Sequence, residues 1–169
     1  MRAFRRGCVA LHEARPPPDD PDRFTLTAST PSREVREFPA RFAAVADTAD
    51  FAFGFCERNG FPRQTALRVR LILEELLTNS IRHGYRAERD TGIRIELDVV
   101  EGCPAIVYED SAPPYDPLVR MSAVAPGDDV SVDAPPGDGV GVVLIGKLTE
   151  RAQYAYEDGH NRLSLVVRA

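Results

Sequence analysis

Residues 63–85 read RQTALRVRLILEELLTNSIRHGY, and they carry the clearest helical pattern in the chain. Gly84 follows this pattern at a position typical of a helix C-terminus. The pattern therefore predicts a long amphipathic helix over residues 63–84. Five positions at helical spacing make one stripe of this helix: Val69, Ile72, Leu73, Leu76 and Ser80.

Polar side chains stand within the otherwise apolar second half of this helix. Glu75 and Asn79 are four residues apart and so lie one turn apart on one face, and His83 continues the same line. A carboxylate in an apolar stretch can act as a general base. An amide oxygen is a neutral, hard ligand that suits Mg²⁺. On the evidence of this helix alone, a solvated polar face remains the simpler interpretation.

Alternation of apolar and polar residues predicts strands in the C-terminal half. Residues 93–99 alternate strictly, and residues 105–108 form a second strand. Residues 152–156 and 163–167 are two further strands, joined through the EDG turn at 157–159, which is a hairpin signal.

The patterns before the long helix are shorter. Residues 24–28 alternate like a strand, and residues 32–37 carry polar residues that favour the start of a helix, which Pro39 interrupts. Residues 41–58 are rich in Ala and Phe and predict one amphipathic helix, and residues 139–148 predict another.

This order of elements predicts an α+β fold. Strands joined by hairpins favour a mixed, mostly antiparallel sheet, and the helices would cover one face of it in a two-layer α/β sandwich. We expect residues 24–169 to form one domain, preceded by a flexible Pro-Asp-rich leader at residues 1–23. Residues 111–138 contain six prolines, and a loop of this length is either functional or disordered.

Composition excludes several classes of protein. The 169 residues carry a net charge of −5, which argues against general nucleic-acid binding. No apolar run approaches the roughly 20 residues that span a bilayer. Three separate cysteines without a C-x-x-C pair indicate neither a zinc site nor a disulfide framework, and free thiols fit a cytoplasmic protein.

Two weaker signals lie after the predicted strands. Asp110 ends a strand, and a carboxylate there can accept a hydrogen bond from the exocyclic amine of a purine. Gly137, Gly139 and Gly141 lie at the start of a helix, where backbone N–H groups can approach a phosphate. These glycines do not make a P-loop, because no strand and no G-K-[ST] sequence accompany them.

Four segments in this order resemble the GHKL ATPase superfamily, and more closely the bacterial anti-sigma factor serine kinases. The resemblance covers roughly residues 24–168 and implies the Bergerat ATP-binding fold. The segments are LEELLTNSIRHGY (73–85), EDSAPPYDP (109–117), GDGVGVVLIGKL (137–148) and EDGHNRLSLVVR (157–168).

The resemblance implies a role for each candidate site residue. Glu75 would be the catalytic base, Asn79 would bind the Mg²⁺ that bridges the ATP phosphates, and Asp110 would bind the adenine amine. Residues 111–138 would form an ATP lid. The remaining cofactor-binding positions would lie beside the nucleotide or at the hinge of the lid: His83, Gly84, Tyr85, Gly137, Gly139 and Gly141.

The sequence departs from the family pattern at two places that bear on ATP affinity. Ala112 stands where the family has Gly, and its methyl group is expected to crowd the nucleotide or to demand a different backbone. Some members carry Thr in the last hairpin near the adenine, where this chain reads HNR at residues 160–162.

The resemblance implies an ATP-dependent serine/threonine kinase that sequesters a sigma factor, phosphorylates an anti-sigma antagonist of the STAS type and acts as a homodimer. The alternative is a non-catalytic module that binds ATP, or no nucleotide, and acts only by sequestration. The ATPase part of a sensor histidine kinase is less favoured because no upstream helix presents a phosphorylatable histidine. A metal-dependent hydrolase is less favoured because the three histidines are dispersed.

Overall fold

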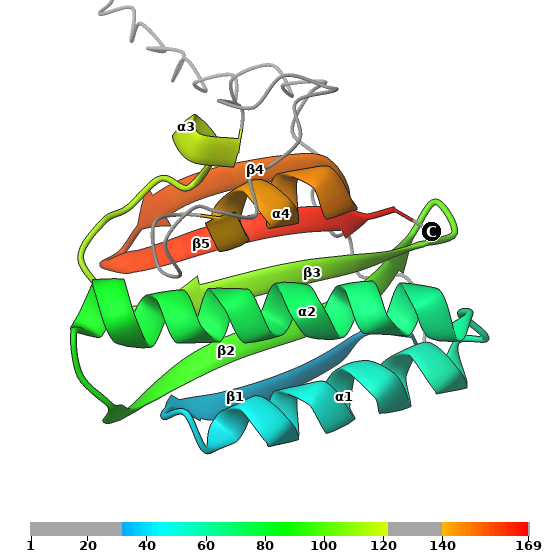
Figure 1. The fold of residues 1–169 in the computed structure, drawn as a ribbon, viewed down its shortest axis with the longest axis horizontal. Coiled ribbons are helices and arrows are strands. Elements are labelled where there is room, and N and C mark those ends of the chain that lie inside the picture. The colour runs from blue at the N-terminus through cyan, green and yellow to red at the C-terminus, as the bar shows by residue number, and fades with distance from the viewer. Residues whose placement is uncertain (1–31, 122–139, 169) are drawn as a thin grey trace, which may run out of the picture.

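The computed structural model describes residues 32–121 and 140–168 of the chain. They form a five-stranded sheet with helices packed on it (Figure 1). The elements in chain order are β1 (Glu34–Ala40), α1 (Ala44–Arg58), α2 (Arg63–Asn79), the π-helical turn η1 (Ser80–Tyr85), β2 (Arg89–Val100), β3 (Cys103–Asp110), α3 (Leu118–Met121), α4 (Val140–Leu148), β4 (Thr149–Glu157) and β5 (His160–Val167).

The sheet has the strand order β1-β2-β3-β5-β4. All four pairings between its strands are antiparallel, so the mixed sheet allowed by the sequence is replaced by a purely antiparallel one. Helices α1, α2 and α4 lie across the same face of the sheet in Figure 1. The predicted α+β sandwich with helices on one face is confirmed.

The core lies between this helical layer and the sheet. Strand β2 contributes Ile93, Ile95 and Leu97, which are fully buried and belong to one hydrophobic cluster with side chains of α1 and α2. Their alternation with polar residues is the pattern that predicted the strand. The helix α2 contributes the predicted stripe, and Val69, Ile72 and Leu73 on it have no exposed surface.

Residues 34–40 form strand β1, so the helix expected to begin near residue 32 is wrong. Phe38 pairs with Ile93 of β2 and is buried, whereas Val35 on the other face is 44% exposed. Pro39 is tolerated because β1 is an edge strand, where a missing N–H breaks no ladder. Pairing with β2 therefore outweighs the local helix signals. The strand expected over residues 24–28 lies outside the described residues.

The closing hairpin β4–β5 is confirmed. Asp158 and Gly159 occupy its turn with φ of 51° and 83°, the left-handed conformations that an Asp-Gly hairpin turn requires. Because β5 pairs with both β3 and β4, the start of β5 lies beside the end of β3. In this register Asp110 pairs with Asn161.

Candidate functional site

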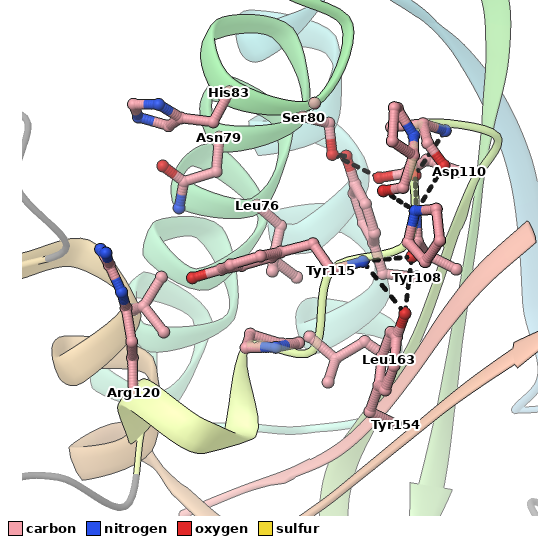
Figure 2. Close-up of a pocket in the computed structure, with 17 residues that line it drawn as sticks. Leu76, Asn79, Ser80, His83, Tyr108, Asp110, Tyr115, Arg120, Tyr154 and Leu163 are labelled. Carbon is pink, nitrogen blue, oxygen red and sulfur yellow. Dashed lines mark hydrogen bonds between the residues drawn. The ribbon is translucent and has the colours of Figure 1, made fainter.

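A cavity of about 440 Å³ opens where the end of α2, the end of β3, the segment after β3, the start of α4 and the hairpin β4–β5 come together (Figure 2). We call it the main cavity. Four of the predicted site residues line it: Asn79, His83, Gly84 and Asp110. Figure 2 labels ten of the lining residues: Leu76, Asn79, Ser80, His83, Tyr108, Asp110, Tyr115, Arg120, Tyr154 and Leu163.

The carboxylate of Asp110 is buried at one end of the main cavity and accepts hydrogen bonds on both oxygens. Ser80 donates to Oδ2 at 2.5 Å, and the Asn161 amide donates to Oδ1 at 2.8 Å. The backbone N–H of Ala112 also donates to Oδ1, at 3.0 Å. Three donors satisfy only part of the acceptor capacity of a carboxylate, so a further donor from a ligand can be accepted.

Tyr108 extends this network into the core. Its hydroxyl donates to Ser80 Oγ at 2.9 Å, which leaves the Ser80 proton for Asp110. Burial raises the pKa of Tyr108 well above its ordinary value, so the phenol stays protonated and remains a donor. Both hydrogen bonds of this series, from Tyr108 to Ser80 and from Ser80 to Asp110, are therefore donated toward Asp110.

Asn161 links the closing hairpin to the segment after β3. Its amide nitrogen donates to the carbonyls of Ala112 at 2.9 Å and Pro113 at 3.3 Å, in addition to Asp110. Its amide oxygen accepts from Tyr154 Oη at 2.8 Å and from the backbone N–H of Tyr115 at 3.1 Å. One buried side chain therefore positions the cavity wall on both sides of Asp110.

Ala112 contributes to this wall, and its methyl group is directed toward η1. A Cβ atom added at Gly84 would lie 2.8 Å from the Cβ of Ala112, closer than two carbon atoms can pack. The absence of a side chain at Gly84 thus makes room for the methyl group of Ala112. Ala112 itself is buried, with 4% of its surface exposed.

Asn79 lies at the other end of the main cavity from Asp110 in Figure 2. It is half-buried, and its amide makes no hydrogen bond within the part of the chain that the structure describes. A polar amide that faces a cavity without a protein partner is free to bind a ligand. The described residues contain no group of three or more His, Cys, Asp or Glu side chains placed to hold a metal ion. A cation bound here would therefore need oxygens of a ligand or of water beside Asn79.

Glu75 lies one turn before Asn79 and does not line the main cavity. Its carboxylate packs against the first turn of α4, where a Cβ added at Gly141 would lie 1.9 Å from Glu75 Oε2. Burial raises the pKa of Glu75, the charge of Glu74 adds to this, and Arg82 opposes it. Glu75 and Gly141, each predicted as a site residue, are thus in direct contact with each other, beside the main cavity rather than inside it.

The other predicted site residues are placed less centrally. His83 is exposed, and Figure 2 shows its ring directed away from Asp110. Tyr85 accepts a hydrogen bond from the Ser111 backbone N–H at 2.9 Å and lines a second cavity with Arg86 and Arg89. Gly137 and Gly139, with most of the predicted lid, lie outside the described residues.

Sequence patterns did not single out several residues that shape the main cavity. Ser80 was assigned to the apolar stripe of α2, and Tyr108 to the strand that β3 forms. Asn161 was noted only as a departure from the family pattern. Its pairing with Asp110 could have been inferred only by knowing that β3 and β5 are neighbours. Tyr115 lies in the family-like segment 109–117 but was given no role, and Arg120 and Tyr154 belonged to no motif.

Comparisons with known proteins agree with the resemblance expected from the sequence. A family model described as a histidine kinase-like ATPase domain matches residues 38–167. The serine-protein kinase RsbW of Listeria innocua is 25% identical over 109 residues, which cover 63% of this chain and 68% of that protein. The serine-protein kinase RsbW of Listeria monocytogenes is 27% identical over 108 residues, with the same coverage.

A solved structure shares the fold. A chain in the crystal structure of the SiaB–SiaC complex from Pseudomonas aeruginosa superimposes with a TM-score of 0.57. The match covers 79% of this chain and 88% of that chain at 17% identity, which is a likeness of fold. Among the described residues, no helix is both long enough and apolar enough to cross a bilayer.

Proposed function

The chain belongs to the histidine kinase-like ATPase domain family, and from this premise we propose that it is an ATP-dependent protein serine/threonine kinase that also sequesters a sigma factor. The observation that carries the proposal is a single cavity with a hydrogen-bonded, buried carboxylate at one end and an unpartnered amide at the other. The two relatives from Listeria are named serine-protein kinases, which supports the proposed reaction.

The main cavity has the polarity that an adenine nucleotide needs. Asp110 accepts only, because Ser80, Asn161 and the Ala112 N–H all donate to it. It therefore selects a ligand that presents a donor, such as the 6-amino group of adenine, over one that presents a carbonyl, such as guanine. Tyr115 and Tyr154 add aromatic surface next to it. Gly84, which lines the same cavity, belongs to the adenine-binding end in this proposal.

The opposite end suits the phosphates. Asn79 would hold Mg²⁺ through its amide oxygen, and the ion would neutralise charge on the phosphate oxygens. Gly141 belongs to the first turn of α4, where backbone N–H groups favour an anion. His83 lies at the rim of the same cavity.

Glu75 is the catalytic base in this proposal. It accepts the proton of a serine hydroxyl on the partner while the hydroxyl oxygen bonds to the γ-phosphorus of ATP. The bond from that phosphorus to the β–γ bridging oxygen breaks, and ADP leaves. The raised pKa of Glu75 makes the carboxylate a stronger base than an ordinary glutamate.

The partners follow from the same family membership. We propose that the phosphorylated protein is an anti-sigma antagonist of the STAS type, that a sigma factor is the sequestered protein, and that the chain acts as a cytoplasmic homodimer. These assignments are tested by co-purification with each partner class and by light scattering of the free chain.

The decisive experiment combines calorimetry with phosphoryl transfer. Wild-type protein should bind ATP and ADP with magnesium-dependent affinity and transfer labelled phosphate to a serine of a STAS-type protein. Glu75→Gln should abolish transfer and leave ATP binding largely intact. Glu74→Gln is the matched control, because Glu74 lies next in sequence and pairs on the surface with Arg70 at 2.6 Å.

The outcomes separate the candidate functions. Binding without transfer in the wild type would favour a nucleotide-binding module that acts by sequestration alone. Equal loss of binding and transfer in Glu75→Gln would refute the assignment of the base. A wild type that binds no nucleotide would refute the ATPase site itself.

A further inference from the structure

The main cavity contains one strongly basic side chain. Arg120 is the only Arg or Lys among the described residues that line it, in a chain whose net charge is −5. Its guanidinium makes no ion pair or hydrogen bond within the described part of the chain. Most other arginines near the sheet, such as Arg33, Arg94 and Arg162, are paired with carboxylates. An unpaired cation that faces a cavity in an acidic protein is a candidate anion ligand.

The backbone position of Arg120 is determined by contacts on both sides of α3. Asp116 begins this short helix by accepting a hydrogen bond from the Leu118 N–H at 2.9 Å. The carbonyl of the buried Pro117 accepts from the N–H groups of Arg120 and Met121 at 3.1 and 3.0 Å. Arg120 therefore projects from a hydrogen-bonded turn.

Helix α4 holds the other side of this turn. A Cβ added at Gly146 would lie 3.1 Å from the Met121 carbonyl oxygen and 3.3 Å from its Cβ, so the two helices touch where Gly146 lacks a side chain. Met121 also packs against the hydrophobic core. This contact holds α3, and Arg120 with it, against α4, whose residue Val142 lines the main cavity.

The side chain of Arg120 extends toward the Asn79 end of the cavity. Figure 2 shows its guanidinium on the same side as the Asn79 amide and the Tyr115 hydroxyl, away from Asp110. A nucleotide whose base lies at Asp110 would carry its phosphates to this side. A guanidinium group is planar, carries five N–H donors and can bind two phosphate oxygens at once. A lysine ammonium group acts as a point charge and lacks this geometric specificity.

We propose that Arg120 is a further nucleotide-binding residue that contacts the phosphate tail of ATP opposite Asn79. This inference rests on the proposed function, because it assumes that an adenine nucleotide occupies the main cavity. It adds to the family site a cation from the PYDPLVRM segment at residues 114–121, which carries no recognised phosphate motif.

The test is calorimetric titration of the full chain with ATP, ADP and adenosine. Arg120→Ala should weaken ATP binding by about tenfold or more, the usual effect of losing hydrogen bonds to a charged group. Adenosine should bind as it does to the wild type, which also shows that the variant is folded. Arg120→Lys should keep part of the ATP affinity, because it keeps the charge but loses the fork of donors.

Arg63→Ala is the matched control, because Arg63 is an exposed arginine at the opposite end of α2 and its loss changes the net charge equally. It should leave all three affinities unchanged. Unaltered ATP affinity in Arg120→Ala, or an equal loss for adenosine and ATP, would overturn the assignment of Arg120 alone. A wild type that binds adenosine and ATP equally would overturn it as well. A wild type that binds none of the three ligands would overturn both this inference and the proposed function.

Discussion

Glu75 and Asn79 share one face of α2, yet the fold gives their side chains different surroundings. Asn79 faces the main cavity and its amide has no hydrogen-bonding partner in residues 32–121 and 140–168, whereas Glu75 packs against Gly141 of α4. The sequence predicted their common face but not this difference, because the difference depends on where α4 packs. Among the described residues the partly buried carboxylate of Glu75 has no hydrogen-bonding partner, which lowers stability and is typical of a functional group.

Glu75→Gln should stabilise the protein at neutral pH. The folded pKa of Glu75 is raised above its unfolded value, so the folded state binds more protons and loses stability as the pH rises through that raised pKa. The gain in the variant should be below about 1 kcal/mol, because solvent screens a partly exposed carboxylate. Denaturant titrations across pH measure it.

The pH dependence of this stability gain shows whether it comes from the charge of Glu75 or from a change in packing. The difference between Glu75→Gln and wild type should vanish below the ordinary glutamate pKa of 4.5, where both folded and unfolded carboxyls are protonated. A gain that persisted at acid pH would point to packing rather than charge. Glu74→Gln should show only part of this gain, because it removes the repulsion that Glu74 adds but leaves Glu75 as buried as before.

Asn161 is the residue with the most hydrogen bonds to the cavity wall. Asn161→Ala should lower the free energy of unfolding by about 1–3 kcal/mol, because the buried carboxylate of Asp110 loses a donor and the half-buried hydroxyl of Tyr154 loses an acceptor. Adenosine affinity should fall with it, since Asp110 loses a positioning donor. Chemical denaturation and calorimetry check the two effects, and an unchanged denaturation midpoint would contradict the structural role.

At the scale of elements, the end of α2 differs most from the sequence-based expectation. The predicted helix over residues 63–84 is α-helical only to Asn79 and continues as the π-helical turn η1. A π turn is wider than an α turn, and Asn79 and His83, which lie just before and within it, both line the main cavity. The wider turn carries Gly84 up against the segment after β3, where Ala112 packs.

The contact between Gly84 and Ala112 predicts a compensating pair of substitutions. Gly84→Ala should destabilise the protein by about 1–3 kcal/mol, the usual cost of overpacking, and should weaken ATP binding. The φ of Gly84 is not positive, so backbone strain adds nothing to this penalty. Adding Ala112→Gly should restore most of the loss, because it removes the methyl group that the new side chain meets.

A double-mutant cycle measures this coupling. If the two substitutions were additive, the two methyl groups would not compete for one space, and the packing at this contact would be different from that described. Ala112→Gly alone should leave the fold intact, since it removes only one methyl group from the contact with Gly84.

At the scale of the molecule, the sheet face opposite the helices carries a ladder of charges. Glu96 is almost fully buried and pairs with Arg33 at 2.7 Å and with Arg94 at 3.0 Å. Arg94 also pairs with Glu109, which pairs in turn with Arg162. These ion pairs extend across β2, β3 and β5, and the arginines neutralise the carboxylates that are buried on this face of the sheet.

Glu96→Ala should lower the free energy of unfolding by roughly 1–3 kcal/mol. Breaking a fully buried ion pair costs more, but Arg33 and Arg94 keep about a third of their side-chain surface in solvent and can rehydrate. Urea denaturation measures the change. Asp90→Ala is the control, because Asp90 is exposed and solvent screens its pair with Arg41, which should make its effect clearly smaller. Equal effects of the two substitutions would refute the ladder as a stabilising feature.

The sequence by itself determined the layers of this protein and part of its candidate site. Periodicity of 3.6 or 2 residues is local, so α2, β2, β3 and the closing hairpin could be predicted, together with Glu75, Asn79 and Asp110 as residues of interest. Strand β1 could not, because only its pairing with β2 outweighs the helix signals around Pro39.

Only the tertiary structure decided which residues surround Glu75, Asn79 and Asp110. The register of β3 against β5 places Asn161 beside Asp110, the π turn brings Gly84 onto Ala112, and the packing of α3 on α4 directs Arg120 into the cavity. Each of these contacts joins residues far apart in the chain. Local sequence patterns contain no information on such pairs, because the contacts arise only when the sheet and the helical layer pack together.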